Sequence, residues 1–194
     1  MPRAGLSREV VVAEAAQVAD EVGWERLTLA AVAERLGVAV PSLYKHVDGI
    51  GELRRDLTVM ALRELGVALG SAGDRGDDAG DGLRAIAEAY RAYARAYPGR
   101  YPATLRAGDP DDRDADEASR ALLQTVFGVL AHYGLSGDDA IDATRALRAA
   151  LHGFVTLEVV GGFGLPRDVD RSFVRLVQIL DTAFRNWSPE RMLL

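Results

Sequence analysis

The 194-residue chain contains no cysteine, and this absence excludes several classes of protein at once. Without thiols there is no disulfide framework, thiol nucleophile, zinc knuckle or iron–sulfur ligation. Histidine is scarce as well, with three residues, and the sequence has no glycine-rich phosphate loop or nucleophile elbow. Because no set of side chains suggests catalysis, we expect neither an enzyme nor a cofactor. The acidic runs at 74–81 and 109–117 lack the spacing of a calcium loop, so no metal site is expected.

Long apolar runs are also lacking. A transmembrane helix needs roughly 20 consecutive apolar residues, and residues 1–8 lack the apolar segment of a secretory signal. We therefore expect a soluble, cytoplasmic protein with no membrane partner. Lysine is almost missing, since Lys45 accompanies 22 arginines, and acidic residues outnumber basic ones 29 to 23. The net charge of −6 disfavours a protein that coats or bends DNA through a broad basic surface, but it allows a small local surface to read DNA.

Strand signals are missing too, because alternation of apolar and polar residues never persists. Apolar residues instead recur at helical spacing, and alanine and leucine are abundant. The sequence predicts an all-α fold with about eight helices, at 8–22, 29–36, 40–47, 52–69, 83–97, 118–133, 138–160 and 168–186. The acidic segments 71–82 and 108–116 are expected to be loops. We expect a functional boundary near residue 50, with a DNA-binding domain at 1–50 and a helical effector-binding and dimerisation domain at 51–194.

The most informative pattern lies between Thr28 and Leu53, where two short helices are joined by a turn around Gly37. The expected shared core is Leu29, Val32, Leu36, Val38 and Leu43. This is the geometry of a helix-turn-helix, whose second helix enters the major groove of DNA. Its first turn carries small groups that can approach base edges, and hydrogen-bond donors to phosphate follow. The expected DNA-binding residues are Thr28, Val40, Pro41, Ser42, Tyr44, Lys45 and His46.

Each of these residues also has a plainer interpretation. The hydroxyl of Thr28 is suited both to a phosphate and to capping its own helix, and the two roles are compatible. Taken alone, Tyr44 is a half-buried packing residue, and His46 is an ordinary cation at a helix C-terminus.

At these residues the chain resembles the tetracycline-repressor (TetR) family of bacterial transcriptional regulators. The matching pattern is Thr28, Ala33, Leu36-Gly37-Val38, Pro41-Ser42-Leu43-Tyr44-Lys45-His46-Val47 and Leu53. The segment Leu151-His152-Gly153-Phe154 resembles the C-terminal type named for a Trp-His-Gly motif, with leucine in place of tryptophan. The resemblance implies a homodimer that binds a DNA operator and a small-molecule effector. Ile50 stands where many relatives carry a phosphate-binding lysine, and we expect Arg54 or Arg55 to take over that role.

The larger C-terminal part carries tyrosines at helical spacing, Tyr90, Tyr93 and Tyr97, followed by Tyr101. Because a buried hydroxyl needs a hydrogen-bond partner, these side chains either line a cavity with polar walls or pack in the core with local partners. In the TetR family such a cavity binds an effector, so the resemblance favours the first alternative. The expected ligand-binding residues are Tyr93, Tyr97, Tyr101, Phe127, His152 and Thr156.

The segments 138–160 and 168–186 are apolar on more than one face, which requires burial on more than one side. Either they form a four-helix interface between two copies, or they are an internal pair. The sequence thus predicts a ligand-responsive repressor that binds a palindromic operator as a homodimer. The alternative is a helical ligand-binding or carrier protein without a DNA role, which would have no need of the Pro-Ser-Leu-Tyr-Lys-His segment.

Overall fold

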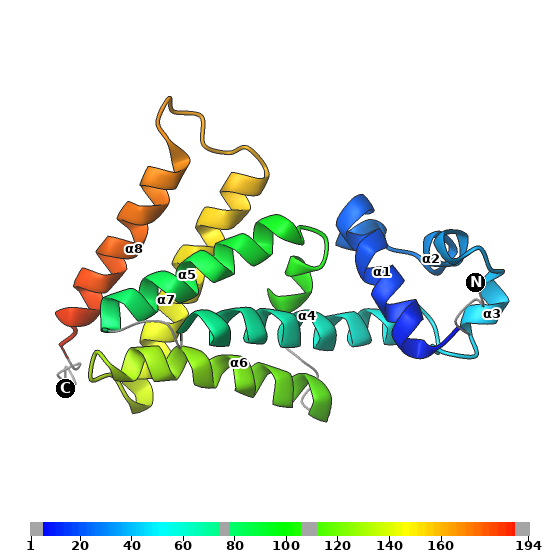
Figure 1. Cartoon of the computed structure of the whole chain (residues 1–194), viewed down its shortest axis with the longest axis horizontal. Helices are drawn as coiled ribbons and strands as arrows, with labels where there is room; N and C mark the ends of the chain where they lie inside the picture. The colour runs from blue at the N-terminus through cyan, green and yellow to red at the C-terminus, as the bar shows by residue number, and fades with distance from the viewer. Residues whose placement is uncertain (1–5, 74–77, 106–111, 189–194) are drawn as a thin grey trace, which may run out of the picture. The chain divides into compact units, whose positions relative to one another are not determined.

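The computed structural model describes residues 6–73, 78–105 and 112–188, and helices account for nearly all of their regular structure (Figure 1). The all-α prediction is confirmed, since these ranges contain eight α-helices, two 3₁₀ helices and no strand. The elements are α1 (Arg8–Val22), η1 (Trp24–Arg26), α2 (Leu29–Leu36), α3 (Val40–Leu43), α4 (Ile50–Gly73), α5 (Ala79–Ala96), η2 (Tyr101–Leu105), α6 (Arg113–Ala131), α7 (Gly137–Val159) and α8 (Val169–Arg185). None of the helices in these ranges is both long and apolar enough to span a bilayer.

The chain divides into two compact units. The first comprises residues 1–64 and 96–119, and the second comprises residues 65–95 and 120–194. Helices α4 and α6 therefore contribute residues to both units. The functional boundary expected near residue 50 stays a prediction.

Local signals explain the helices that begin the first unit. The hydroxyl of Ser7 accepts the amide of Val10 at 3.3 Å and caps α1, which ends at Gly23 with a φ of 89°. The hydroxyl of Thr28 caps α2 in the same way, and Gly37 ends that helix in the left-handed conformation with a φ of 66°. Apolar side chains on these helices and on the first turns of α4 then enclose one core. Its largest fully buried members are Val11, Leu27, Val32, Leu43, Val47, Leu53 and Leu57.

The second unit is held by apolar packing and by ion pairs, among them a cluster around Arg91. Helices α7 and α8 pack against each other, and Leu147, Leu151, Val155, Phe173, Val177 and Phe184 are buried. Arg91 of α5 donates to both carboxylate oxygens of Glu158, one of them at 2.8 Å, and to Asp170 at 2.7 Å. Its guanidinium also lies 4.7 Å from the centre of the Phe173 ring. This single arginine therefore connects α5 with α7 and with the first turn of α8.

Two segments expected as loops are partly helical. Helix α4 continues to Gly73 and α5 begins at Ala79, while α6 begins at Arg113. Capping explains the early starts of α5 and α6: a carboxylate oxygen of Asp78 accepts the amide of Asp81 at 2.9 Å, and one of Asp112 accepts the amide of Ala115 at 3.2 Å. Acidic residues favour the first turn of a helix, so the acidic runs mark helix starts as well as loops. Residues 74–77 and 106–111 lie outside the described residues.

Candidate nucleic-acid interface

Helices α2 and α3 form the expected pair around Gly37. Because that glycine is left-handed, the chain reverses there, and the amide of Val38 donates to the carbonyl of Ala33 at 3.0 Å. All five predicted core residues face the same cluster: Val32 and Leu43 are fully buried, and Leu29, Leu36 and Val38 are partly buried against it. The second helix of the motif is thus fixed to the first unit by its inner face, which leaves its outer face to solvent.

The second helix is shorter than predicted. An α-helix was expected over 40–47, but α3 ends at Leu43, and residues 44–46 form a turn. The amides of His46 and Val47 both donate to the carbonyl of Leu43, at 2.8 and 3.0 Å, so the last turn is tightened. Ala39 at the N-cap supplies no side-chain hydrogen bond, and Pro41 occupies the first turn, where a missing amide proton costs nothing.

Six of the seven predicted DNA-binding residues lie together on α3 and the turn that follows it. Pro41 and Lys45 are exposed, Val40, Ser42 and His46 are half-buried, and 55% of Tyr44 is exposed. An aromatic residue with that exposure does not serve the core as a packing residue. Its ring and hydroxyl are instead available to a partner outside the chain.

Thr28 is exposed at the start of α2, where its hydroxyl oxygen accepts the amide of Ala31 at 3.2 Å. A hydroxyl has one proton to donate besides the lone pairs with which it accepts. The cap uses a lone pair and leaves the proton, so capping and phosphate binding remain compatible at this residue.

The structure does not favour the role expected for Arg54 or Arg55, because both guanidinium groups are engaged within the first unit. Arg54 donates from one nitrogen towards the carbonyls of Trp24, Glu25 and Leu27, at 3.3, 3.3 and 3.4 Å. Arg55 donates two hydrogen bonds of 2.6 Å to Asp112 and one of 2.8 Å to Asp114. Neither arginine replaces the phosphate-binding lysine that is missing at Ile50.

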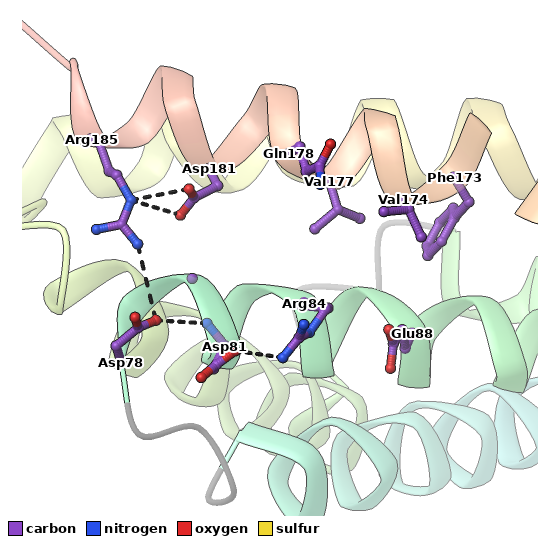
Figure 2. Close-up of a pocket in the computed structure, with 11 residues that line it drawn as sticks. Asp78, Asp81, Arg84, Glu88, Phe173, Val174, Val177, Gln178, Asp181 and Arg185 are labelled. Carbon is purple, nitrogen blue, oxygen red and sulfur yellow. Dashed lines mark hydrogen bonds and ion pairs between the residues drawn. The ribbon is translucent and has the colours of Figure 1, made fainter. Parts of the chain in front are cut away.

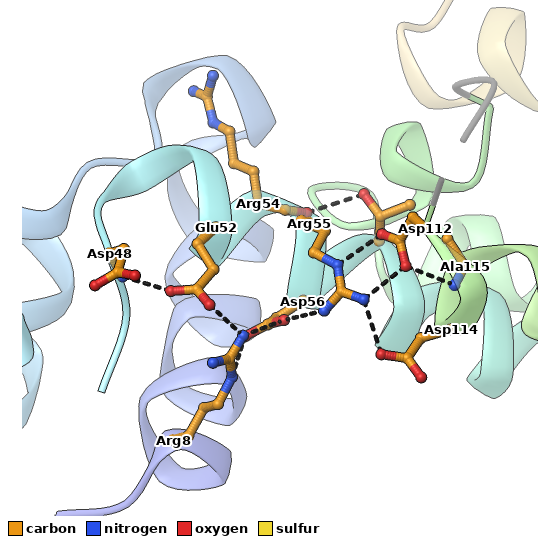
Figure 3. A network of polar contacts seen from close by, with 10 residues as sticks. Arg8, Asp48, Glu52, Arg54, Arg55, Asp56, Asp112, Asp114 and Ala115 are labelled. Atoms are coloured by element: carbon orange, nitrogen blue, oxygen red, sulfur yellow. Dashed lines mark hydrogen bonds and ion pairs between the residues drawn. The ribbon is translucent and has the colours of Figure 1, made fainter. Parts of the chain in front are cut away.

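Arg55 belongs to a chain of ion pairs that the sequence did not reveal (Figure 3). Arg8 of α1 donates to both oxygens of Asp56, at 2.7 and 2.9 Å, and lies 2.7 Å from Glu52. Arg55 lies 3.2 Å from the same Asp56, so α1, the start of α4 and the start of α6 are joined by alternating charges. The hydrogen bonds from Arg55 hold the pKa of Asp112 below its ordinary value, so that carboxylate stays ionised.

Glu52 extends this network to the segment after α3. Its carboxylate accepts the backbone amide of Asp48, and this bond, followed by that from Arg8, lowers the pKa of Glu52. Asp48, two residues after the turn that carries Tyr44, Lys45 and His46, is therefore anchored to α4. In the sequence, only the neighbouring charges of Glu52, Arg55 and Asp56 could have indicated this ion-pair network. Their partners Arg8 and Asp112 are far away in the sequence.

The predicted ligand-binding residues are divided between the two units. Tyr93, Phe127, His152 and Thr156 belong to the second unit, and Tyr97 and Tyr101 belong to the first. Tyr93 and Tyr101 are buried, Phe127 and His152 are half-buried, and Thr156 is exposed. The Thr156 hydroxyl lies 3.2 Å from Nδ1 of His152, so these two do come together.

Sequence comparison assigns both parts of the chain. Residues 11–55 match the family described as "Bacterial regulatory proteins, tetR family", and residues 83–180 match "Tetracyclin repressor-like, C-terminal domain". The chain belongs to the TetR family. As a TetR-family protein with a helix-turn-helix, it is a DNA-binding transcriptional regulator, and the expected family resemblance is confirmed.

Two relatives of this TetR-family regulator are also named as helix-turn-helix transcriptional regulators. It is 40% identical over 159 residues to the uncharacterized HTH-type transcriptional regulator Rv0681 of Mycobacterium tuberculosis, a match that covers 81% of this chain and 72% of that one. It is 33% identical over 171 residues to the uncharacterized HTH-type transcriptional regulator YobS of Bacillus subtilis, covering 87% of each chain. Its fold is similar to that of a TetR variant of Acinetobacter baumannii AYE solved in complex with minocycline, with a TM-score of 0.69, 23% identity, and coverage of 95% of this chain and 99% of that one.

Proposed function

We propose that this TetR-family regulator acts in the cytoplasm as a homodimeric repressor, which binds a palindromic operator and is released by a small-molecule effector. The observation that carries the proposal is the outer face of α3 and its following turn. There Pro41, Tyr44 and Lys45 are exposed, while Leu43 between them is fully buried. A helix whose inner face is packed in the core, while its outer face is exposed to solvent, is suited to enter the major groove of DNA.

Two kinds of contact are expected from this segment. Val40, Pro41 and Ser42 lie in the first turn of α3, where a recognition helix contacts base edges. Tyr44, Lys45 and His46 lie in the turn beyond it and carry hydrogen-bond donors suited to phosphate oxygens, as does the hydroxyl of Thr28. The base-edge contacts would determine which DNA sequence is preferred, and the phosphate contacts would contribute affinity for any DNA sequence.

We expect replacement of Tyr44 by phenylalanine to weaken binding to every DNA duplex by about tenfold, because one phosphate contact worth about 1–1.5 kcal/mol is lost. Replacement of Ser42 should instead change the order in which base pairs are preferred. Fluorescence anisotropy titrations with selected and random duplexes measure both effects. The matched control is Tyr97→Phe, which removes a hydroxyl outside the helix-turn-helix and should leave DNA affinity unchanged. A change of sequence preference at constant mean affinity in Tyr44→Phe would refute the assignment.

Exposed apolar side chains on α7, on the residue that follows it and on α8 support the homodimer. Ile141, Leu157 and Val160 are exposed, and so is Ile179, at 63% of its surface. Apolar side chains gathered on two neighbouring helices favour association with a second copy. A two-fold dimer presents two recognition helices about 34–36 Å apart or a multiple of that distance, so the operator would be an inverted repeat.

We predict a sedimentation mass of twice the 20.9 kDa of one chain at micromolar concentration. Ile179→Asp should weaken dimerisation by more than about tenfold, because it places an unpaired carboxylate in the contact. Val67 of α4 is equally apolar and exposed, so Val67→Asp is the control and should remain dimeric. A wild-type mass of one chain would remove the dimer from the proposal.

For the effector we propose a small, largely apolar or aromatic molecule, held within the second unit by Tyr93, Phe127, His152 and Thr156. The support is their chemistry: aromatic rings with a few hydroxyl and imidazole groups suit such a ligand. The minocycline bound to a protein of similar fold points the same way.

A further inference from the structure

A groove of about 230 Å³ lies between α5 and α8 within the second unit (Figure 2). Helix α8 supplies its apolar wall with Phe173, Val174 and Val177. The rest of the lining consists of Gly80, Gln178 and six charged residues from both helices and from the residue before α5: Asp78, Asp81, Arg84, Glu88, Asp181 and Arg185. None of the residues predicted for the effector is among the lining residues, so this is a different site.

One end of the groove is closed by ion pairs. Arg185 donates to both oxygens of Asp181 at 3.0 Å and lies 4.0 Å from Asp78, and Arg84 pairs with Asp81. Gly80 lies beside this cluster, and a Cβ at that position would lie 2.9 Å from a guanidinium nitrogen of Arg185. The hydroxyl of Tyr133 lies 2.6 Å from Asp181 and, with its pKa raised by burial, stays protonated there. Both arginines of the groove are therefore already engaged by carboxylates.

The other end of the groove presents one carboxylate to an apolar wall. Figure 2 shows Glu88 on α5 across from Phe173 and Val174 of α8. Glu88 is exposed, and within the described ranges it forms no hydrogen bond or ion pair. With four carboxylates and two guanidinium groups in the lining, the groove carries a net charge of −2. One of these two excess negative charges, that of Glu88, lies next to the apolar wall.

We propose that this groove binds a small organic cation, with its ammonium group on the Glu88 carboxylate and its alkyl or aryl body against Phe173, Val174 and Val177. An anion is disfavoured, because the net charge repels it and both arginines are occupied. A metal ion is disfavoured as well, since the described residues contain no group of three or more potential ligands. The volume corresponds to about eight waters at roughly 30 Å³ each, so the ligand is smaller than a drug.

The groove remains open in the proposed dimer. Val174 and Ile179 are five residues apart on α8, which places them about 140° apart around the helix at about 100° per residue. The face that carries Ile179 can therefore contact a second copy while Val174 stays in the groove. The proposal also stands without the DNA-binding role, because it uses no residue of the helix-turn-helix.

Three probes with the same alkyl chain test the proposal: hexylammonium, hexanol and hexanoate. Each is titrated into the full chain labelled at valine methyl groups and followed by NMR. Hexylammonium should shift the methyl signals of Val174 and Val177 in a saturable way, and should bind at least about threefold more tightly than hexanol, because one charge contact is added. Hexanoate should produce no saturable shift. Equal effects from all three probes, or shifts that leave out both valines, would overturn the proposal.

Two variants locate the ammonium group. Glu88→Gln removes the charge and keeps the shape, and it should erase the preference of the groove for hexylammonium over hexanol. Glu117→Gln removes an exposed carboxylate of α6 that is not part of the groove, and it should leave that preference unchanged. A preference that survives in Glu88→Gln would show that the ammonium group binds elsewhere.

Discussion

Replacing Gly99 with alanine is expected to lower the free energy of unfolding by about 4 kcal/mol, at the upper end of what a single substitution does. A Cβ at this position would lie 1.7 Å from the carbonyl oxygen of Ala19 and 2.5 Å from the Cα of Asp20. Both are backbone atoms of α1, so no side-chain rotation relieves the overlap. The segment that follows α5 must move away from α1, and the hydrogen bond from the Gly99 amide to Asp20, 3.1 Å long, is lost with it.

Urea denaturation measures this effect. The matched control is Gly128→Ala in α6, an exposed helical glycine with no atom within 4 Å of the added Cβ. That substitution should raise stability by about 0.5–1 kcal/mol, because alanine loses less backbone entropy than glycine in a helix. If Gly99→Ala unfolds at the same urea concentration as the wild type, the close approach of the two segments is refuted.

Replacing Arg100 with methionine is expected to cost about 3 kcal/mol, because it removes a guanidinium group that two carboxylates share in a partly buried site. Arg100 is only 7% exposed, and its guanidinium donates to Asp20 at 2.8 Å and to both oxygens of Glu64 at 3.0 and 3.1 Å. Methionine keeps the apolar stem of the side chain, so the loss reports the charge contacts.

Two comparisons test this prediction by urea denaturation. Arg84→Met breaks an exposed ion pair with Asp81 and should change stability by less than about 0.5 kcal/mol. Combining Arg100→Met with Asp20→Asn should cost less than the sum of the two single changes, since both remove the same interaction. If the changes in the free energy of unfolding were strictly additive, the interaction between Arg100 and Asp20 would contribute nothing to stability.

The parts of the fold that sequence could predict are those set by neighbouring residues. Ser7, Gly23, Thr28 and Gly37 mark helix ends through bonds that span three to five residues, and the structure places all four as expected. Asp78 and Asp112 act by the same local rule, but they stand within acidic runs, so the sequence did not distinguish a capping carboxylate from a loop residue.

Residues whose partners lie far away in the sequence could not be placed. Arg55 resembles a phosphate-binding residue until Asp112, 57 positions later, is brought against it. Helical spacing put Tyr90, Tyr93 and Tyr97 on one face without deciding between a cavity and the core. The structure buries Tyr90 and Tyr93, but α5 ends at Ala96, and Tyr97 is 38% exposed. The spacing of the tyrosines alone does not show where the helix ends; the local signal for that end is Pro98-Gly99, which directly follows Tyr97.

The most direct test of the account is selection of bound sequences from a pool of random DNA duplexes by the full-length protein. The account predicts that an inverted repeat is enriched, with half-site centres about one helical turn or a multiple of it apart. It also predicts that the same selection with a Ser42 variant returns an inverted repeat with altered bases at unchanged spacing. Enrichment of no sequence, or of a single unrepeated site, would contradict the claim that two copies of α3 read DNA together.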